Sequence, residues 1–342
     1  MQANRTRKRA LPRRGLAVLC AALALVLDFN VSTAEAAPFV YVTSPAVPGT
    51  ISVLDAASNT VAATVSVDGA PISVAVTPDG KRAYIAMRKL SGGTVSVLDT
   101  ATNMVVATVP VTDFFIGGVA ITPDGKHAYV ANSGNDHTVK VLDTATNQVA
   151  ATIPLNLSID LAFTPNGKHA YVTDFEGVSV IDTATNTVET TITIGKGDTV
   201  TVGRGIAITP DGKNAHLTNG GSNTVPVIDT ATNTVSATVV VGVDPVGVAV
   251  TPDGKRAYVT NHGSSDVSVI DTAANALVAT VGVRTAPVGV ATTADGKHVY
   301  VTNSGSGTVS VIDTATNKVV VEVTAGKEPF GIAIIPLPPI TR

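Results

Sequence analysis

The chain has 342 residues, of which 44% are hydrophobic and 14% are charged. This composition excludes an intrinsically disordered chain, because such chains combine low hydrophobicity with high charge. The formal net charge of −3 gives no support to a nucleic-acid-binding protein, which is typically basic.

The N-terminal segment, residues 1–36, has the order of a secretory signal peptide. Six basic residues lie within the first fourteen, an apolar run of 13 residues follows over positions 15–27, and Ala34-Glu35-Ala36 offers a small-x-small cleavage site. The run is shorter than the roughly 20 apolar residues of a membrane-spanning helix. We therefore expect an exported protein, periplasmic, extracellular or at the cell surface, with no transmembrane span after cleavage. An uncleaved N-terminal anchor is the alternative.

Cleavage after Ala36 would change the charge of the mature chain. It would remove six of the 23 basic residues, two of the 26 acidic residues and Cys20, the only cysteine, so that the net charge becomes −7. The mature chain would then have no thiol for a disulfide or for catalysis. The negative charge also argues against DNA binding.

From Pro38 onward, one unit of roughly 42 residues recurs. An aromatic position repeats with spacings of 43, 45, 42, 45, 42 and 42 residues. It is occupied by Tyr41, Tyr84, Tyr129, Tyr171, His216, Tyr258 and Tyr300. Self-similarity at a fixed period is typical of solenoids, propellers and other repeat architectures.

Each unit predicts four short antiparallel strands. It contains four apolar runs, with Pro-Asp-Gly-Lys or a close variant between the first and second and Asp-Thr-Ala-Thr-Asn or a close variant between the third and fourth. Gly, Asp and Asn favour tight turns, and no segment beyond the leader shows a helical period. Seven such units predict an all-β, seven-bladed β-propeller with four-stranded blades.

The two ends of the repeat region predict how the ring closes. Residues 39–43 have the pattern of a second strand, and residues 331–336 have the pattern of a first strand. We therefore expect blade one to consist of residues 39–68 plus 331–336, so that the C-terminal strand leaves no open edge. Residues 37–342 would then form one propeller domain, which we expect to be a monomer.

The segments Tyr258-Val259-Thr260-Asn261 and Tyr300-Val301-Thr302-Asn303 resemble the YVTN-type β-propeller repeat family of bacterial and archaeal extracytoplasmic and surface-layer proteins. The resemblance covers residues 39–336, nearly the whole mature chain. It implies the fold and an extracytoplasmic location, but it encodes blades and not a site.

The repeated polar residues predict structural roles. The Asp, Asn and Thr residues lie in turns, where their side chains bond the local backbone. His127, His169 and His298 share one position of the repeat, but equivalent positions on different blades point away from one another. Zinc needs three or four converging ligands, so we expect no metal site. No hydrolase, metalloprotease or phosphate-loop motif is present, so we assign no catalytic residue, and the cofactor stays unknown.

The face that carries the irregular loops is the candidate binding surface, because binding residues tend to lie on loops held by a rigid scaffold. Those loops connect the second and third strands of a blade, or one blade to the next. They and the adjoining strand ends supply the candidate ligand-binding residues Asp160, Arg204, Phe114, Phe115, Arg88, Asp174, Glu176 and His262.

Asp160 and Arg204 depart most clearly from the repeat. Most blades begin their first, innermost strand with glycine, whereas blade four places Asp160 there and blade two places Ser73. Arg204 lies one position earlier in blade five, where other blades have mostly apolar residues. An ion pair at the channel mouth would orient a polar ligand or merely fix a loop.

Three functions compete at this stage. The first is a non-enzymatic binding module for an unknown envelope protein, glycan or small molecule, held over the central channel. The second is an enzyme, since similar seven-bladed propellers include lactonases and lyases; His137, His262, Asp160, Asp174 and Glu176 are the available groups. The third is periplasmic DNA binding, which the net charge of the mature chain disfavours.

Overall fold

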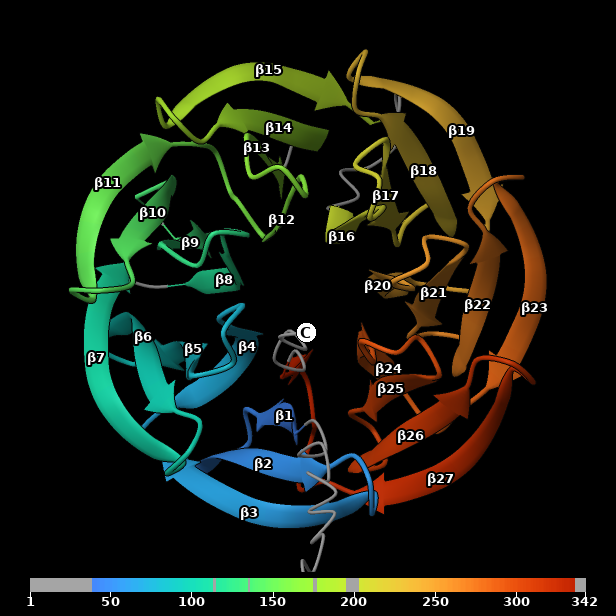
Figure 1. The fold of residues 1–342 in the computed structure, drawn as a ribbon, viewed down its shortest axis with the longest axis horizontal. Coiled ribbons are helices and arrows are strands. Elements are labelled where there is room, and N and C mark those ends of the chain that lie inside the picture. The colour runs from blue at the N-terminus through green and yellow to red at the C-terminus, as the bar shows by residue number, and fades with distance from the viewer. Residues whose placement is uncertain (1–38, 113–114, 135, 175–176, 195–202, 336–342) are drawn as a thin grey trace, which may run out of the picture. The chain divides into compact units, whose positions relative to one another are not determined.

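The computed structural model describes residues 39–112, 115–134, 136–174, 177–194 and 203–335. They form seven four-stranded antiparallel sheets, arranged as blades around a central axis (Figure 1). These residues contain no helix, so no membrane-spanning helix lies within the described ranges. The predicted all-β, seven-bladed propeller is confirmed.

The first three blades run from the innermost to the outermost strand as follows. Blade one comprises β28 (Ile332–Ile334), β1 (Phe39–Ser44), β2 (Gly49–Asp55) and β3 (Thr60–Val67). Blade two comprises β4 (Ala70–Val76), β5 (Arg82–Lys89), β6 (Gly92–Asp99) and β7 (Met104–Thr112). Blade three comprises β8 (Ile116–Ile121), β9 (His127–Asn132), β10 (Thr138–Asp143) and β11 (Gln148–Pro154).

The remaining four blades repeat this order. Blade four comprises β12 (Asp160–Phe163), β13 (His169–Thr173), β14 (Gly177–Asp182) and β15 (Thr187–Thr193). Blade five comprises β16 (Gly203–Ile208), β17 (Asn214–Asn219), β18 (Thr224–Asp229) and β19 (Thr234–Val240). Blade six comprises β20 (Pro245–Val250), β21 (Arg256–Asn261), β22 (Asp266–Asp271) and β23 (Ala276–Gly282). Blade seven comprises β24 (Pro287–Thr292), β25 (His298–Asn303), β26 (Thr308–Asp313) and β27 (Lys318–Thr324).

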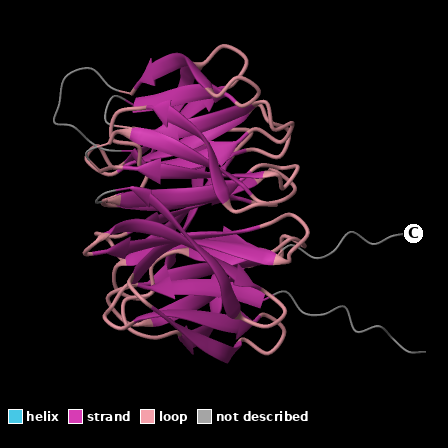
Figure 2. Ribbon diagram, turned by 90° about the vertical axis from the view of Figure 1, so that its left-hand side faces the viewer, coloured by secondary structure: helices cyan, strands magenta, loops and turns pink. Residues whose placement is uncertain are grey.

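Antiparallel pairing divides the connections between two faces of the disc, which Figure 2 shows edge-on. The turn face carries the turns between first and second strands and between third and fourth strands. The loop face carries the loops between second and third strands and the links between blades. Because every blade runs the same way, the near-identical turns gather on one face and the irregular loops on the other.

The C-terminal strand closes the ring as the sequence predicts. β28 pairs antiparallel with β1, with Val40 opposite Ile334 and Val42 opposite Ile332. The backbone of Thr43 adds two hydrogen bonds. Its N–H donates to the carbonyl oxygen of Gly331, and its carbonyl oxygen accepts the N–H of Phe330. Blade one therefore joins segments from both ends of the repeat region and leaves no unpaired inner edge.

Burial follows the strand order within each blade. The second strands are almost continuously buried, as in β13, whereas the outermost strands are mostly exposed, as in β15. Buried apolar side chains form seven clusters among the described residues, and each cluster joins two neighbouring blades. The hydrophobic core is therefore a ring of seams between blades, and most of the stabilisation lies where one blade meets the next.

The repeated tyrosine bonds each blade to the next. Its buried hydroxyl donates to the side-chain oxygen of the asparagine that ends the Asp-Thr-Ala-Thr-Asn turn of the following blade. The six pairs are Tyr41–Asn103, Tyr84–Asn147, Tyr129–Asn186, Tyr171–Asn233, Tyr258–Asn317 and, across the ring closure, Tyr300–Asn59. These asparagines have positive φ, a conformation that Asn tolerates better than most residues.

The seventh seam lacks this bond. His216 replaces the tyrosine in blade five and is fully buried, and neither of its ring nitrogens has a hydrogen-bond partner among the described residues. The side-chain oxygen of Asn275, at the turn position that accepts the tyrosine bond in other blades, is also buried without a partner there. Burial lowers the pKa of His216 from 6.5 to about 4. The seam between blades five and six is therefore the least well bonded on the turn face.

We expect His216→Tyr to stabilise the protein. A restored Tyr–Asn hydrogen bond contributes about 1 kcal/mol. The pKa of His216 is 6.5 in the unfolded chain and about 4 in the folded protein, so between these values protonation favours the unfolded chain and wild type loses stability. Tyrosine does not titrate in this range, and the advantage of His216→Tyr therefore grows by a further ~2 kcal/mol at pH 5. Urea denaturation at pH 7.5 and pH 5 measures both effects.

Tyr258→Phe is the matched control at a complete seam. It removes one hydroxyl from the same position of the repeat, so it should cost about 1 kcal/mol without adding a dependence on pH between 5 and 7.5. Equal stability of His216→Tyr and wild type at both pH values would contradict this account of the seam.

Candidate functional site

A cavity of about 490 Å³ lies on the central axis. Equivalent residues of the repeat, at or near the start of each of the seven innermost strands, line it: Ser73, Gly118, Asp160, Gly205, Gly247, Gly289 and Gly331. Ser133, His262 and Ser304, which follow second strands, line it as well. Because both sets lie at the loop-face ends of their strands, the cavity is at that end of the channel, where the sequence predicts the site.

Glycine prevails at this position because neighbouring inner strands approach very closely. A Cβ atom on Gly247 would lie 2.4 Å from the carbonyl oxygen of Val288 in the next blade. The same carbonyl accepts a 2.7 Å hydrogen bond from the Oγ1 of Thr260. The threonine of the Tyr-Val-Thr-Asn segment thus holds the adjacent inner strand at a distance that a side chain at the glycine would prevent.

Ser73 and Asp160 are the two exceptions, and both use their side chains in the same way. The hydroxyl of Ser73 accepts the backbone N–H of Val119 at 3.3 Å. The carboxylate of Asp160 accepts the N–H of Ile206, which holds the corresponding position in the blade after it, and also the N–H of Leu161. Each exception therefore uses its side chain to contact the backbone of the inner strand of the following blade.

Asp160 brings a titratable carboxyl group to the centre of the ring. Its Oδ1 packs against Gly118 of blade three, where an added Cβ atom would lie only 2.3 Å from that oxygen. Asp160 of blade four therefore contacts both neighbouring blades, three and five. Enclosure by these strands raises the pKa of Asp160 from 3.8 to about 7, and the two N–H bonds only partly oppose the rise. A carboxyl group that titrates near neutral pH in a cavity is a candidate for binding or proton transfer.

His262 reaches the same cavity from blade six. Its Nδ1 lies 3.3 Å from the Oδ2 of Asp244, in the link that precedes β20. The structure therefore brings two of the predicted site residues, Asp160 and His262, to one cavity. They belong to different blades, and the spacing of the repeat alone shows only that both lie near the loop face.

Arg88 and Phe115 form a second group on the loop face. The Cζ of Arg88 lies 5.9 Å from the ring centroid of Phe115, at the outer limit of a cation–π contact. Both side chains are exposed. Phe115 directly precedes Ile116, which lines the central cavity, so this pair stands beside the cavity and not in it.

Asp174 has a structural environment. Its side chain is buried, and its carboxylate accepts the N–H of Gly177 at 2.9 Å and the hydroxyl of Ser179. It thus holds the tight loop between β13 and β14. It also borders a groove of about 570 Å³ together with His137 and Thr191, which is separate from the central cavity.

Three of the predicted residues cannot be placed. Phe114 and Glu176 lie outside the described residues, and so does the side chain of Arg204, although its backbone belongs to β16. The pairing of Asp160 with Arg204 therefore stays a prediction.

The repeated turn residues have the structural roles that the sequence predicts. Asp79 of a Pro-Asp-Gly-Lys turn accepts the hydroxyl of Thr77 at 2.6 Å and the N–H of Lys81 at 3.0 Å. Asp99 of the other turn accepts both the N–H and the hydroxyl of Thr102. These bonds lower the pKa of both carboxyl groups. The repeated aspartates are therefore turn residues and not a ring of ligands.

Comparison with known proteins supports the fold. No family model matches the chain, and no curated protein matches it. Among solved structures, a chain named Kuenenia stuttgartiensis hydrazine synthase is similar, with a TM-score of 0.72 and 26% identity over 85% of this chain and 99% of that one. A functionally unknown protein from Desulfotomaculum acetoxidans DSM 771 is similar with a TM-score of 0.71 and 21% identity over 87% and 99%.

We expect Asp160→Asn to become more stable than wild type as pH rises. The raised pKa means that protonated Asp160 stabilises the fold fully below pH 3.8, and that this contribution is lost as pH rises through about 7. Asparagine keeps an acceptor for a backbone N–H and removes the titration. The difference in unfolding free energy between variant and wild type should increase by about 2–3 kcal/mol from pH 5 to pH 8.

Ser73→Ala serves as the control for Asp160→Asn. It removes the bond to Val119 without removing a titrating group, so any cost should be equal at pH 5 and pH 8. Guanidinium denaturation of the three proteins at both pH values makes the comparison. A pH-independent effect of Asp160→Asn would show that the carboxyl group is not held in a desolvated position.

Proposed function

We propose that this chain is an exported, non-enzymatic binding propeller whose central cavity takes a small cationic ligand. The observation that carries the proposal is the position of Asp160, which replaces a glycine of the repeat and places a carboxylate against the blades on both sides. A volume of about 490 Å³ lies within the range of small-molecule sites. Apolar inner-strand residues such as Val248 and Val290 also line the cavity.

Charge supports a cation as the ligand. A buried carboxylate is costly unless a positive charge or hydrogen bonds stabilise it, and two N–H bonds leave the pKa of Asp160 at about 7. A bound cation would stabilise the ionised carboxylate and so lower that pKa, and the same attraction would favour binding of the cation. The net charge of −7 on the mature chain would also attract cations to the cavity.

Export rests on the sequence of the first 36 residues and on the resemblance to extracytoplasmic YVTN-type propellers. Neither similar structure bears on it, and the leader lies outside the described residues. Cleavage after Ala36, read by N-terminal sequencing of the protein from envelope or culture supernatant, would establish it.

An enzyme is the second candidate, because a carboxyl group with a pKa near 7 suits general acid–base catalysis. One of the two similar structures is also named as an enzyme. The binding function is preferred because, among the described residues that line the cavity, no nucleophile is hydrogen-bonded to a base. A lactonase or lyase would show turnover in a screen of lactones and esters, and Asp160→Asn would abolish that turnover.

Amine binding tests the proposal directly. We expect a small diamine such as putrescine or a quaternary amine such as choline to bind the full chain saturably at pH 8 in calorimetry. Affinity should fall about tenfold per pH unit below pH 7, because the proton on Asp160 must leave before the cation binds. Asp160→Asn should lose this binding, whereas Ser73→Ala should keep it.

An uncharged alcohol of similar size is the matched ligand control and should not bind with this pH dependence. Saturable amine binding that is the same in Asp160→Asn and wild type would move the ligand away from the cavity. Absence of amine binding at millimolar concentration would remove the proposed ligand class.

A further inference from the structure

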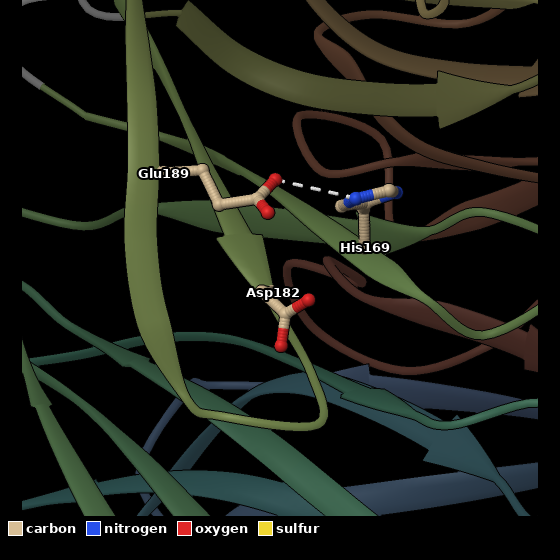
Figure 3. Close-up of side chains that lie close together, drawn as sticks. All are labelled: His169, Asp182 and Glu189. Carbon is tan, nitrogen blue, oxygen red and sulfur yellow. Dashed lines mark ion pairs between the residues drawn. The ribbon is translucent and has the colours of Figure 1, made fainter.

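The outer surface of blade four carries a second group of convergent side chains, on the turn face and away from the central cavity. Figure 3 shows His169, Asp182 and Glu189, which come from the beginning of β13, the end of β14 and the beginning of β15. One potential ligand atom from each side chain lies within 4.8 Å of the other two. All three side chains are partly exposed, so an ion from solution can reach them.

Two of these ligand atoms already have the separation that one bound ion requires. The Nε2 of His169 lies 3.2 Å from the Oε2 of Glu189. Ligand bonds of about 2.0–2.1 Å at tetrahedral angles place two ligand atoms roughly 3.3 Å apart. An ion would therefore fit between the imidazole and the carboxylate with little movement of either.

Asp182 offers the third ligand through its second carboxylate oxygen. Its Oδ1 accepts the N–H of Thr185 at 2.7 Å and the hydroxyl of the same residue at 2.8 Å. Oδ1 is thereby fixed by the turn, as in the other blades, and Oδ2 is left for another partner. In blades two and six the corresponding Oδ2 atoms, of Asp99 and Asp271, bind the guanidinium groups of Arg82 and Arg256.

Blade four therefore replaces a positive side chain by a histidine and adds a second carboxylate. Glu189 is the charged exception at its position, since the other blades have Ala62, Val106, Ala150, Ser236, Val278 and Val320 there. This position is the extra residue of a β-bulge between the third and fourth strands, and the bulge recurs in every blade. In blade four it shifts the register of the two strands between Val180 and Ile181. Bulges re-aim a side chain out of the regular alternation, and here Glu189 contacts His169 of the second strand.

We propose that His169 Nε2, Asp182 Oδ2 and Glu189 Oε2 bind one zinc ion. Imidazole and carboxylate are ligands that zinc accepts, and three protein ligands leave the fourth position to water or an external group. The two carboxylates balance the charge of the dication. This proposal revises the sequence-based expectation that no metal site is present, and it does not depend on the cavity at Asp160.

Zinc titration of the full chain at pH 7.5, by calorimetry and equilibrium dialysis, tests the site. Wild type should bind one Zn²⁺ per chain. Glu189→Val, which installs the residue of blades two, six and seven, should lower the affinity at least tenfold, and His169→Arg, which installs the residue of blades two and six, should abolish binding. Both substitutions are at partly exposed positions and copy side chains that other blades tolerate, so folding should persist and circular dichroism would verify it.

Two further variants separate this site from adventitious binding by surface histidines. His298→Arg changes the equivalent histidine of blade seven, where Val320 stands in place of the glutamate, and should leave the affinity unchanged. Ala150→Glu completes the same trio in blade three with His127 and Asp143, and should raise the stoichiometry from one to two. Zinc binding that is equal in wild type and Glu189→Val, or absent from wild type at about 100 µM Zn²⁺, would overturn the proposal.

Discussion

The close approach of neighbouring inner strands is the constraint on which the rest of the structure depends. At a typical seam, the carbonyl oxygen of one inner strand leaves no room for a Cβ atom on the glycine of the previous inner strand, as Val288 does for Gly247. The threonine of the Tyr-Val-Thr-Asn segment donates a hydrogen bond to the same carbonyl, as Thr260 does to Val288. The tyrosine of the same segment bonds the next blade near the turn face. One short segment thus sets the spacing between blades at both of its ends.

A uniform seam has little capacity for a ligand, because its polar groups are already paired with one another. Function is therefore expected where a blade departs from the repeat, and blades four and five hold the largest departures. Asp160 replaces a glycine on the axis, His216 replaces a tyrosine at a seam, and Glu189 adds a carboxylate on the outer surface. His216 forgoes the hydrogen bond of the repeated tyrosine, and Asp160 occupies a position where other blades have glycine; such departures that cost stability are common at functional sites.

The two candidate sites differ in how they use carboxylates. Asp160 is enclosed, so its charge is poorly solvated, its pKa is near 7, and a cation would compete with a proton for it. Asp182 and Glu189 are solvated at the surface, and hydrogen bonds to Thr185 lower the pKa of Asp182, so a metal ion would meet an ionised group. A ligand at the first site is therefore sensitive to pH near neutrality, whereas a metal ion at the second site meets carboxylates that are already ionised.

The sequence by itself determined the seven units, the strands in each, the turn residues and the closure of blade one, because all of these follow from short-range patterns repeated at a fixed period. It also singled out Asp160 as an exception. Only the tertiary structure showed that Asp160 bonds Ile206 across a seam, that Asp174 turns into its own loop, and that Glu189 reaches His169. Those contacts depend on the register between strands, on a bulge that breaks the two-residue alternation, and on the distance between blades. The spacing of the repeat does not reveal them, because each arises only when separate strands pack together.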